Sequence, residues 1–345
     1  MMRITVEGLL EPFSFSQFRE AYYEKQPLLI SRRVPSYYDG LLTLDALDAH
    51  LGALAQESFA AEEKSLLARF YEGDTIAVPS YERHHAALLH LLHDMERVFH
   101  SPVTTCVYLT PRSAQGSSER QEDDTFILPF AGTRDWTIHD GSGTPVIATA
   151  LGPGDLLYVP GGLVHEARSA DAVAGHMTFV LQKFTYADLL RQIADNADAS
   201  PWLRRSLPVD FRRGALQREF LRQVHQFFDD ADLPAYLERM HGDFAEERLP
   251  DATNRLADYV RLPSIGAASR FRRRSGVWPE LTNGGGQVVL TLHGKSLEFP
   301  APAGESIRFM IEAQEFAASA LPGDGDENLA LCGTLVREGF LTIVS

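Results

Sequence analysis

The segment that decides the fold is Gly154-Asp155-Leu156-Leu157-Tyr158-Val159-Pro160-Gly161-Gly162-Leu163-Val164-His165. Its first residues form a turn, Leu156 to Val159 form a short apolar strand, and the Pro160 to Gly162 turn reverses the chain before His165. A histidine on a strand that follows such a turn points into the interior of a small antiparallel barrel. The segment therefore predicts a barrel with His165 directed inward, either as a functional residue or as a buried histidine that satisfies a hydrogen bond.

Composition limits the class of protein. The chain has 345 residues, of which 44% are hydrophobic and 23% charged, which is enough for two or three domains with a sizeable core. Its formal charge of -15 argues against binding to nucleic acid, because phosphates attract Lys and Arg. The two cysteines, Cys106 and Cys332, suggest no disulfide framework. Because no segment of ~20 apolar residues and no signal peptide is evident, we expect a cytoplasmic protein without membrane contact.

The central part of the sequence has the periodicity of strands. Short apolar or alternating runs are separated at close intervals by Gly, Pro, Ser and Asp, and this spacing favours an antiparallel barrel over a parallel sheet. The predicted strands are Thr104 to Leu109, Phe126 to Phe130, Thr137 to His139, Val146 to Leu151, Leu156 to Val159 and Met177 to Gln182.

Helices are predicted on both sides of these strands. Phe15 to Pro27, Leu41 to Leu54 and Ala86 to Phe99 precede them. After Tyr186, helices are expected at residues 188–197, 215–230 and 233–247. The second of these has a wide apolar stripe that must pack on another surface, either in a second copy of the chain or in this chain's own barrel; it consists of Leu216, Phe220, Val224, Phe227 and Phe228.

The C-terminal region begins after the basic run Arg270 to Arg274, which is predicted as a loop. Its arginines could bind RNA or an acidic partner, but such a run more often fastens a domain junction or stays solvated. A hairpin is expected over residues 287–299, helices over 306–319 and 327–338, and a last strand over 340–344. Two strands, two helices and a strand suggest a winged-helix module. Such modules often read DNA, but the second helix is expected to present Glu327, Asn328, Arg337 and Glu338, a poor face for phosphates, so we expect a structural or protein-contact role.

Several motifs resemble those of JmjC-type cupins. The spacing G-x5-P-x-G-x2-H that ends at His165 resembles the second cupin motif, except that Ser169 replaces its final Asn. Tyr108-Leu109-Thr110-Pro111 with Gln115-Gly116, Asp124 to Leu128 and Gly132 to Trp136 resemble stretches of the ribosomal oxygenases. The resemblance implies an α+β protein: a JmjC cupin barrel, or double-stranded β-helix, with N-terminal helices over 1–185, a helical dimerisation segment over 186–262 and a winged helix over 263–345.

The resemblance also implies a chemistry. Members of the family are Fe(II)- and 2-oxoglutarate-dependent hydroxylases of ribosomal proteins, whose iron is held by an H-x-D pair and a later histidine. Three ligands leave three adjacent positions, two for 2-oxoglutarate and one for O₂. By the family's spacing the H-x-D pair falls on Glu119 and Gln121, so only His165 matches. Arg134 stands where the family anchors the distal carboxylate of 2-oxoglutarate, and Tyr108 and His176 stand in the same pocket.

Three interpretations follow from this departure. In the first, the protein hydroxylates a side chain of a protein or peptide, with a metal held by Glu119, His165 and either Gln121 or His176. In the second, it is a catalytically silent cupin that acts as a peptide-binding or adaptor protein. In the third, the oxygen-rich ligand set takes Mn(II) or Mg(II) in place of Fe(II). A bulge in the acidic loop would bring Glu122 to the metal in place of Gln121.

Overall fold

The computed structural model describes residues 4–57, 66–112, 114, 116–169, 172–207, 216–248, 250–292 and 295–344. They form two compact units, one over Lys183–Arg248 and one made of Met1–Gln182 with Leu249–Ser345. Gln115 and the turn of the predicted C-terminal hairpin at Gly294 lie outside the described residues.

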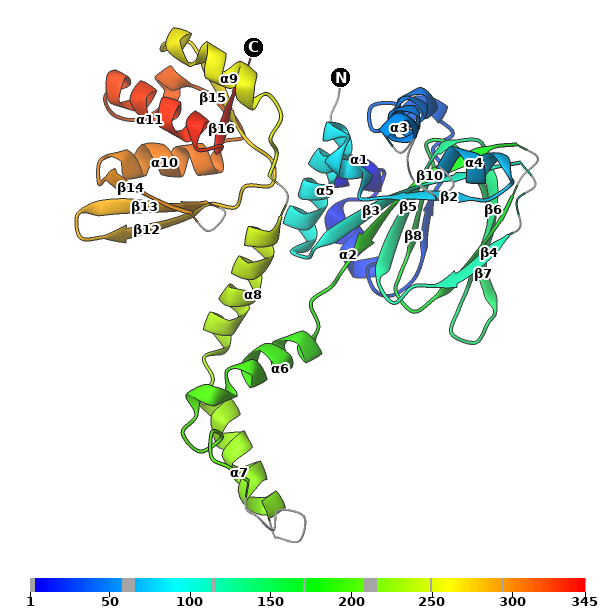
Figure 1. Ribbon diagram of the computed structural model, residues 1–345, viewed down its shortest axis with the longest axis horizontal. Helices are drawn as coiled ribbons and strands as arrows, with labels where there is room; N and C mark the ends of the chain where they lie inside the picture. The colour runs from blue at the N-terminus through cyan, green and yellow to red at the C-terminus, as the bar shows by residue number, and fades with distance from the viewer. Residues whose placement is uncertain are drawn as a thin grey trace. The chain divides into compact units, whose positions relative to one another are not determined.

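The barrel consists of two antiparallel sheets that face each other (Figure 1). The larger sheet has the strand order β1-β8-β5-β10-β3-β2 and the smaller has the order β4-β9-β6-β7. The larger sheet is formed by β1 (Leu28–Ile30), β8 (Leu156–Val159), β5 (Asp124–Ala131), β10 (Ala174–Leu181), β3 (Val103–Thr110) and β2 (Ile76–Pro79). The smaller sheet is formed by β4 (Ser117–Arg120), β9 (Val164–Ser169), β6 (Arg134–His139) and β7 (Pro145–Leu151).

Alternation along the strands separates an outer and an inner face. In β10, Met177 and Phe179 belong to the apolar core between the larger sheet and the helices, so His176 and Thr178 face the other way, toward the smaller sheet. In β6, Trp136 and Ile138 belong to a second apolar cluster, which lies between the two sheets. The predicted antiparallel barrel is therefore confirmed.

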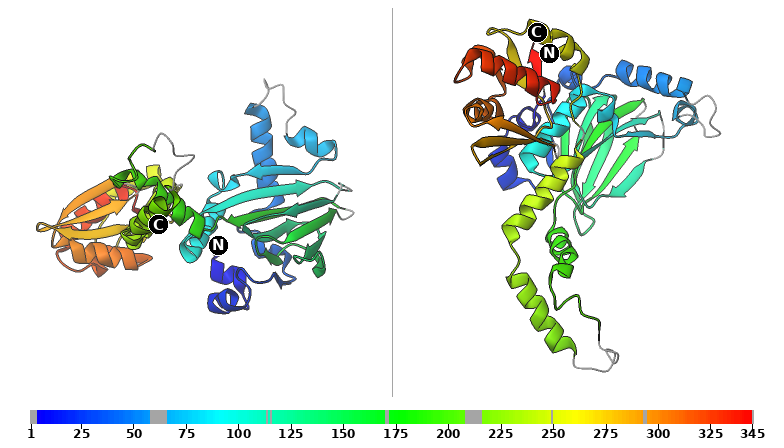
Figure 2. Two further views of the ribbon diagram at one scale, coloured as in Figure 1. Left: turned by 90° about the horizontal axis from the view of Figure 1, so that it is seen from below. Right: turned by 60° about the vertical axis from the view of Figure 1, so that its left-hand side comes forward.

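Helices cover the outer face of the larger sheet (Figures 1 and 2). The N-terminal part contributes α1 (Val6–Leu10), α2 (Phe15–Ala21), α3 (Leu44–Glu57), α4 (Leu66–Tyr71) and α5 (Ala86–Phe99). Phe18 of α2 is fully buried and its ring centroid lies 4.8 Å from that of Tyr158. The helix predicted to run to Pro27 ends at Ala21, because Glu24 has a left-handed φ of 57° and its N–H donates to the Tyr158 hydroxyl.

The unit over Lys183–Arg248 is helical, as the sequence predicts. It contains α6 (Tyr186–Asp195), α7 (Leu216–Asp229) and α8 (Leu233–Glu247). The Asn196 amide donates to the Tyr236 hydroxyl at 2.7 Å, and the Phe184 and Phe244 rings meet edge to face. Much apolar surface stays uncovered within the single chain, since Phe220 is 45% exposed and Leu237 is 53% exposed.

The C-terminal module combines two three-stranded sheets with helices. Its strands are β11 (Arg270–Arg273), β12 (Glu280–Gly284), β13 (Gln287–Leu292), β14 (Lys295–Pro300), β15 (Glu315–Ala317) and β16 (Leu341–Val344). Its helices are α9 (Arg255–Arg261), α10 (Ala303–Glu312) and α11 (Gly325–Arg337). The predicted β13–β14 hairpin is present, with the strands paired antiparallel.

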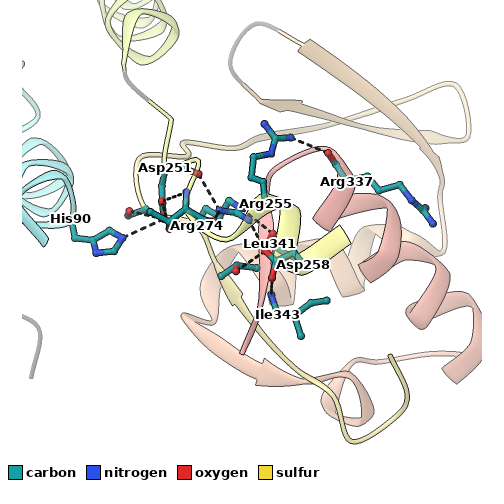
Figure 3. A network of polar contacts seen from close by, with 11 residues as sticks. His90, Asp251, Arg255, Asp258, Arg274, Arg337, Leu341 and Ile343 are labelled. Atoms are coloured by element: carbon teal, nitrogen blue, oxygen red, sulfur yellow. Dashed lines mark hydrogen bonds and ion pairs between the residues drawn. The ribbon is translucent and has the colours of Figure 1, made fainter. Parts of the chain in front are cut away.

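The basic run Arg270 to Arg274 is not a loop. Its residues 270–273 form the central strand of the β15-β11-β16 sheet, because Phe271 fills the core and the arginines find partners on both sides. Arg270 and Arg272 both pair with Glu315, each at 2.8 Å. Arg274 is 2% exposed and donates to Asp258 at 2.6 Å and to the backbone carbonyls of Asp251, Thr253 and Leu341 (Figure 3).

Candidate ligand site inside the barrel

His165 is held in place by the turn that precedes it. Asp124 is fully buried, and its carboxylate accepts hydrogen bonds from the Tyr158 hydroxyl and, at 2.8 Å, from the Gly161 N–H. The Gly162 N–H donates to the Gln121 carbonyl at 2.7 Å. These hydrogen bonds join the turn and the strand before it to Asp124 at the start of β5 and to Gln121 just before β5. The chain therefore enters β9 at a defined register, with His165 opposite Glu119 of β4 and Ile138 of β6.

This turn leads to a first prediction. A Cβ at Gly161 would lie 2.0 Å from the backbone carbonyl oxygen of Glu122, which has no freedom to move away. We expect Gly161→Ala to lower the free energy of unfolding by about 1–3 kcal/mol, measured by urea denaturation. Gly141→Ala is the matched control, since its Cβ would meet nothing within 4 Å. Equal losses in the two variants would contradict this account of the turn.

Trp136 lies at the centre of the barrel interior. Its ring centroid is 5.9 Å from the His165 ring, 5.3 Å from the His176 ring and 5.7 Å from the guanidinium carbon of Arg134. His176 also stacks on Tyr108, with the ring planes 9° from parallel and the centroids 4.9 Å apart. The two sheets thus bring Arg134, His165 and His176 around one indole ring, with Tyr108 stacked on His176, as the resemblance implies for a common pocket.

The polar atoms of this pocket lack protein partners. Arg134 is 5% exposed and donates from Nη2 to the Ala167 carbonyl at 3.2 Å, while its buried Nε–H has no acceptor. The Nδ1 atoms of His165 and His176 are also buried without a partner. In the described part of the chain no carboxylate pairs with the Arg134 guanidinium. A buried cation with free donors is costly, and an anionic ligand would remove that cost.

Burial sets the protonation of the pocket. It lowers the pKa of Arg134, although a guanidinium stays charged, and it lowers the pKa of His165 against the opposing effect of Glu119. Burial, with the positive charges of Arg134 and His165, lowers the pKa of His176 to about 3. Burial likewise raises the pKa of the Tyr108 hydroxyl. At neutral pH the ligand-free pocket therefore contains one fixed cation, neutral imidazoles and a protonated phenol.

The His176 shift leads to a second prediction. The folded-state pKa of about 3 lies below the unfolded value of 6.5, so below pH 6.5 the unfolded chain takes up a proton that the folded chain does not. Stability should therefore fall as the pH is lowered from 6.5 toward 3, with a contribution from His176 of about 1.4 kcal/mol per pH unit. Urea denaturation in EDTA at several pH values should show a shallower slope for His176→Phe. An identical slope in the two proteins would show that His176 is not buried in a neutral form.

The residues predicted to hold iron do not form a three-ligand centre. His165 and Glu119 come together, with Nε2 and Oε2 4.0 Å apart, and the Glu119 side chain is 60% exposed. The Gln121 amide oxygen accepts a hydrogen bond from the Thr125 hydroxyl at 2.7 Å, and Glu122 is 83% exposed beside Arg120. Throughout the described ranges, no three His, Cys, Asp or Glu residues are grouped closely enough to hold a metal ion. The donor set does not fit the family's iron centre.

Sequence reasoning missed two residues that organise the pocket. In the sequence Asp124 and Trp136 stand out only as parts of motifs, yet Asp124 holds the turn before His165 and Trp136 lies beside His165, His176 and Arg134. The alternation of Arg134, Trp136 and Ile138 along one strand is the signal that places Arg134 and Trp136 on the same inner face. No comparable pattern identifies Asp124, which lies at the first position of its strand.

Comparison with known proteins agrees with this fold. Residues 82–189 match the model of the JmjC domain. The chain is 27% identical over 255 residues to the bifunctional lysine-specific demethylase and histidyl-hydroxylase NO66 of Aedes aegypti, covering 59% of this chain and 40% of that protein. It is 26% identical over 279 residues to ribosomal oxygenase 1 of Bos taurus, covering 68% of this chain and 41% of that protein. The chain thus spans well under half the length of these two relatives.

A solved structure resembles the chain over almost its full length. The ribosomal oxygenase YcfD of Escherichia coli superposes with a TM-score of 0.61 at 16% sequence identity, covering 97% of this chain and 99% of that one. YcfD has also been solved in complex with cobalt and 2-oxoglutarate. Residues 82–189 therefore resemble a JmjC domain, and the fold of the chain is the cupin-barrel architecture seen in YcfD. Within the described residues, no helix has the length and hydrophobicity needed to cross a membrane.

Proposed function

We propose that this chain is a protein of the 2-oxoglutarate-dependent oxygenase class that binds a dicarboxylate at Arg134 inside its barrel. One observation carries the proposal: a guanidinium that is 5% exposed, with an unused Nε–H donor and no carboxylate partner among the described residues. Such a group favours a bidentate carboxylate. A solved complex of the ribosomal oxygenase YcfD with cobalt and 2-oxoglutarate supports 2-oxoglutarate as the ligand.

Calorimetric titration of the full chain with 2-oxoglutarate tests this proposal. We expect saturable binding, because the ligand supplies the negative charge and acceptor oxygens that the pocket lacks. The titration should be performed both with EDTA and with Mn(II), so that a ligand bound through a metal is also detected. Absence of binding under both conditions would contradict the proposed function.

The reaction implied by this class is hydroxylation of a protein or peptide side chain, with a ribosomal protein as the proposed substrate. In that case Glu119 and His165, whose Oε2 and Nε2 atoms lie 4.0 Å apart, would be the residues that hold the metal, which would supply the oxidising chemistry. The chain should be incubated with Fe(II), 2-oxoglutarate, O₂ and purified ribosomal proteins. Hydroxylase activity requires succinate formation and the gain of one oxygen atom in a substrate, detected by mass spectrometry.

A second function is favoured by the incomplete donor set. If no metal binds, the barrel is a catalytically silent cupin that recognises a carboxylate or a peptide and acts as an adaptor. The same incubation separates the two functions: succinate formation above the level without protein would rule out the silent form.

We also propose that the helical unit forms a homodimer. Within this unit, an open groove of about 720 Å³ has three aromatic residues, Trp202, Phe227 and Tyr236, in a lining that is otherwise mostly polar. The exposed Phe220 and Leu237 lie on its helices α7 and α8, and such a surface favours contact with a second copy. Light scattering should give twice the mass of the chain at micromolar concentration.

For the C-terminal module, we propose a winged-helix-like protein-contact role.

A further inference from the structure

The pocket around Trp136 has fewer than the three protein ligands that an iron centre needs, and it contains buried polar atoms without a protein partner. Of the three positions that would hold iron, only Glu119 and His165 approach each other, and the Gln121 amide oxygen is engaged by Thr125. His176 does not replace the missing ligand, because its ring is stacked on Tyr108 and meets the edge of Trp136, and it forms no metal-binding group with other described residues.

The pocket also has little negative charge to hold a metal ion. A site for a divalent cation gathers negative charge, whereas the buried Arg134 guanidinium brings positive charge to this interior and has no carboxylate partner among the described residues. The nearest carboxylate named among these residues, Glu119, has a side chain that is 60% exposed. An anion can therefore be bound by the protein's own donors. The buried Arg134 Nε–H is such a donor, and His165 Nδ1 and His176 Nδ1 are buried without a partner and donate when they carry the ring proton.

We propose that the barrel binds dicarboxylates without a metal ion, and that it does not distinguish 2-oxoglutarate from glutarate. The inference rests on the anion site of the proposed function and goes beyond it by naming the ligand class. A metal site selects 2-oxoglutarate because the carboxylate and the adjacent keto oxygen chelate the ion together. Without a metal, the keto oxygen accepts at most one neutral hydrogen bond, worth about 1 kcal/mol or roughly fivefold in affinity.

The experiment is a set of four calorimetric titrations of the full chain. 2-Oxoglutarate and glutarate are each titrated in EDTA and in saturating Mn(II). We expect both ligands to bind in EDTA with dissociation constants within roughly fivefold of each other, and Mn(II) to change neither by more than about twofold. Binding of 2-oxoglutarate that appears only with Mn(II), or that exceeds glutarate binding by fiftyfold or more, would overturn the inference while leaving the proposed function intact. No binding in any titration would overturn both.

The Glu119→Gln variant gives an independent test, because the two accounts predict opposite changes in ligand affinity. Glu119 faces the pocket and its negative charge acts on Tyr108 and His165. If the anion is bound without a metal, Glu119→Gln removes a repulsion and should tighten glutarate binding by about twofold. If Glu119 is a metal ligand, the same change should weaken binding of 2-oxoglutarate in Mn(II) by tenfold or more, which would contradict the inference. Glu166→Gln, one position along β9 from His165 and therefore on the outer face, is the matched control.

Discussion

The Arg134→Met variant should bind 2-oxoglutarate at least about 100-fold more weakly than the wild type and should also be more stable without ligand. The loss follows from two charge-assisted hydrogen bonds of about 1.5 kcal/mol or more each. The gain in stability, about 1 kcal/mol or more, follows because methionine removes a buried charge that has no ion-pair partner among the described residues. Calorimetry and urea denaturation measure the two effects.

Arg168→Met is the matched control for this prediction. Arg168 lies on β9 of the same sheet, where it is exposed and opposite Asp135, so its side chain faces outward. Binding by this variant should equal that of the wild type. If Arg134→Met instead lowers stability and leaves binding intact, the guanidinium is a structural group and not a ligand site.

The Asp258→Ala variant should lower the free energy of unfolding by about 3–5 kcal/mol. Asp258 and Arg274 form an ion pair in which both side chains are 1% exposed, and Asp258 also accepts hydrogen bonds from the Thr342 hydroxyl and the Ile343 N–H (Figure 3). Removing the carboxylate leaves the Arg274 charge buried with only backbone acceptors. Urea denaturation followed by circular dichroism measures the loss.

Two further variants test whether the stability lost in Asp258→Ala comes from the unpaired charge of Arg274. Glu315→Gln removes a partner of Arg270 and Arg272 at the surface and should cause a much smaller loss. The double variant Asp258→Leu with Arg274→Met removes both buried charges and should recover most of the stability lost in Asp258→Ala. If the double variant is as unstable as the single one, the loss comes from packing and not from an unpaired charge.

The barrel could be predicted from the sequence because its strands carry strong local signals. Val146 to Leu151 and Leu156 to Val159 have apolar patterns bounded by turns, and the structure places strands there with shifts of at most one residue at the ends. The strand Ser117–Arg120 was not predicted. Its four residues are all exposed and polar, so no hydrophobic period marks it, and only pairing with β9 makes it a strand.

The C-terminal module also contains a strand that local sequence does not predict. Arg270 to Arg273 read as a loop because a run of arginines has low strand propensity and no apolar alternation beyond Phe271. The partners that make it a strand, Glu315 and the last strand of the chain, lie 40 or more residues away in sequence. Long-range pairing of this kind has no local signature.

The pocket was predicted in part. The sequence identified His165, Arg134, Tyr108 and His176, and the structure places three of them around Trp136 and stacks Tyr108 on His176. It could not show that Gln121 turns its amide to Thr125, because that depends on the path of the chain between two strands. Whether these residues bind 2-oxoglutarate, and whether any of them holds a metal, stays a prediction.

The measurement that tests the central claim most directly is an NMR titration that follows the arginine Nε–H signals of the labelled chain. One signal, absent from the spectrum of Arg134→Met, should move to lower field when 2-oxoglutarate is added, because the buried Nε–H gains the acceptor that it lacks in the free protein. If that signal stays in place while saturating ligand is added, Arg134 does not bind the dicarboxylate and the account of the pocket is wrong.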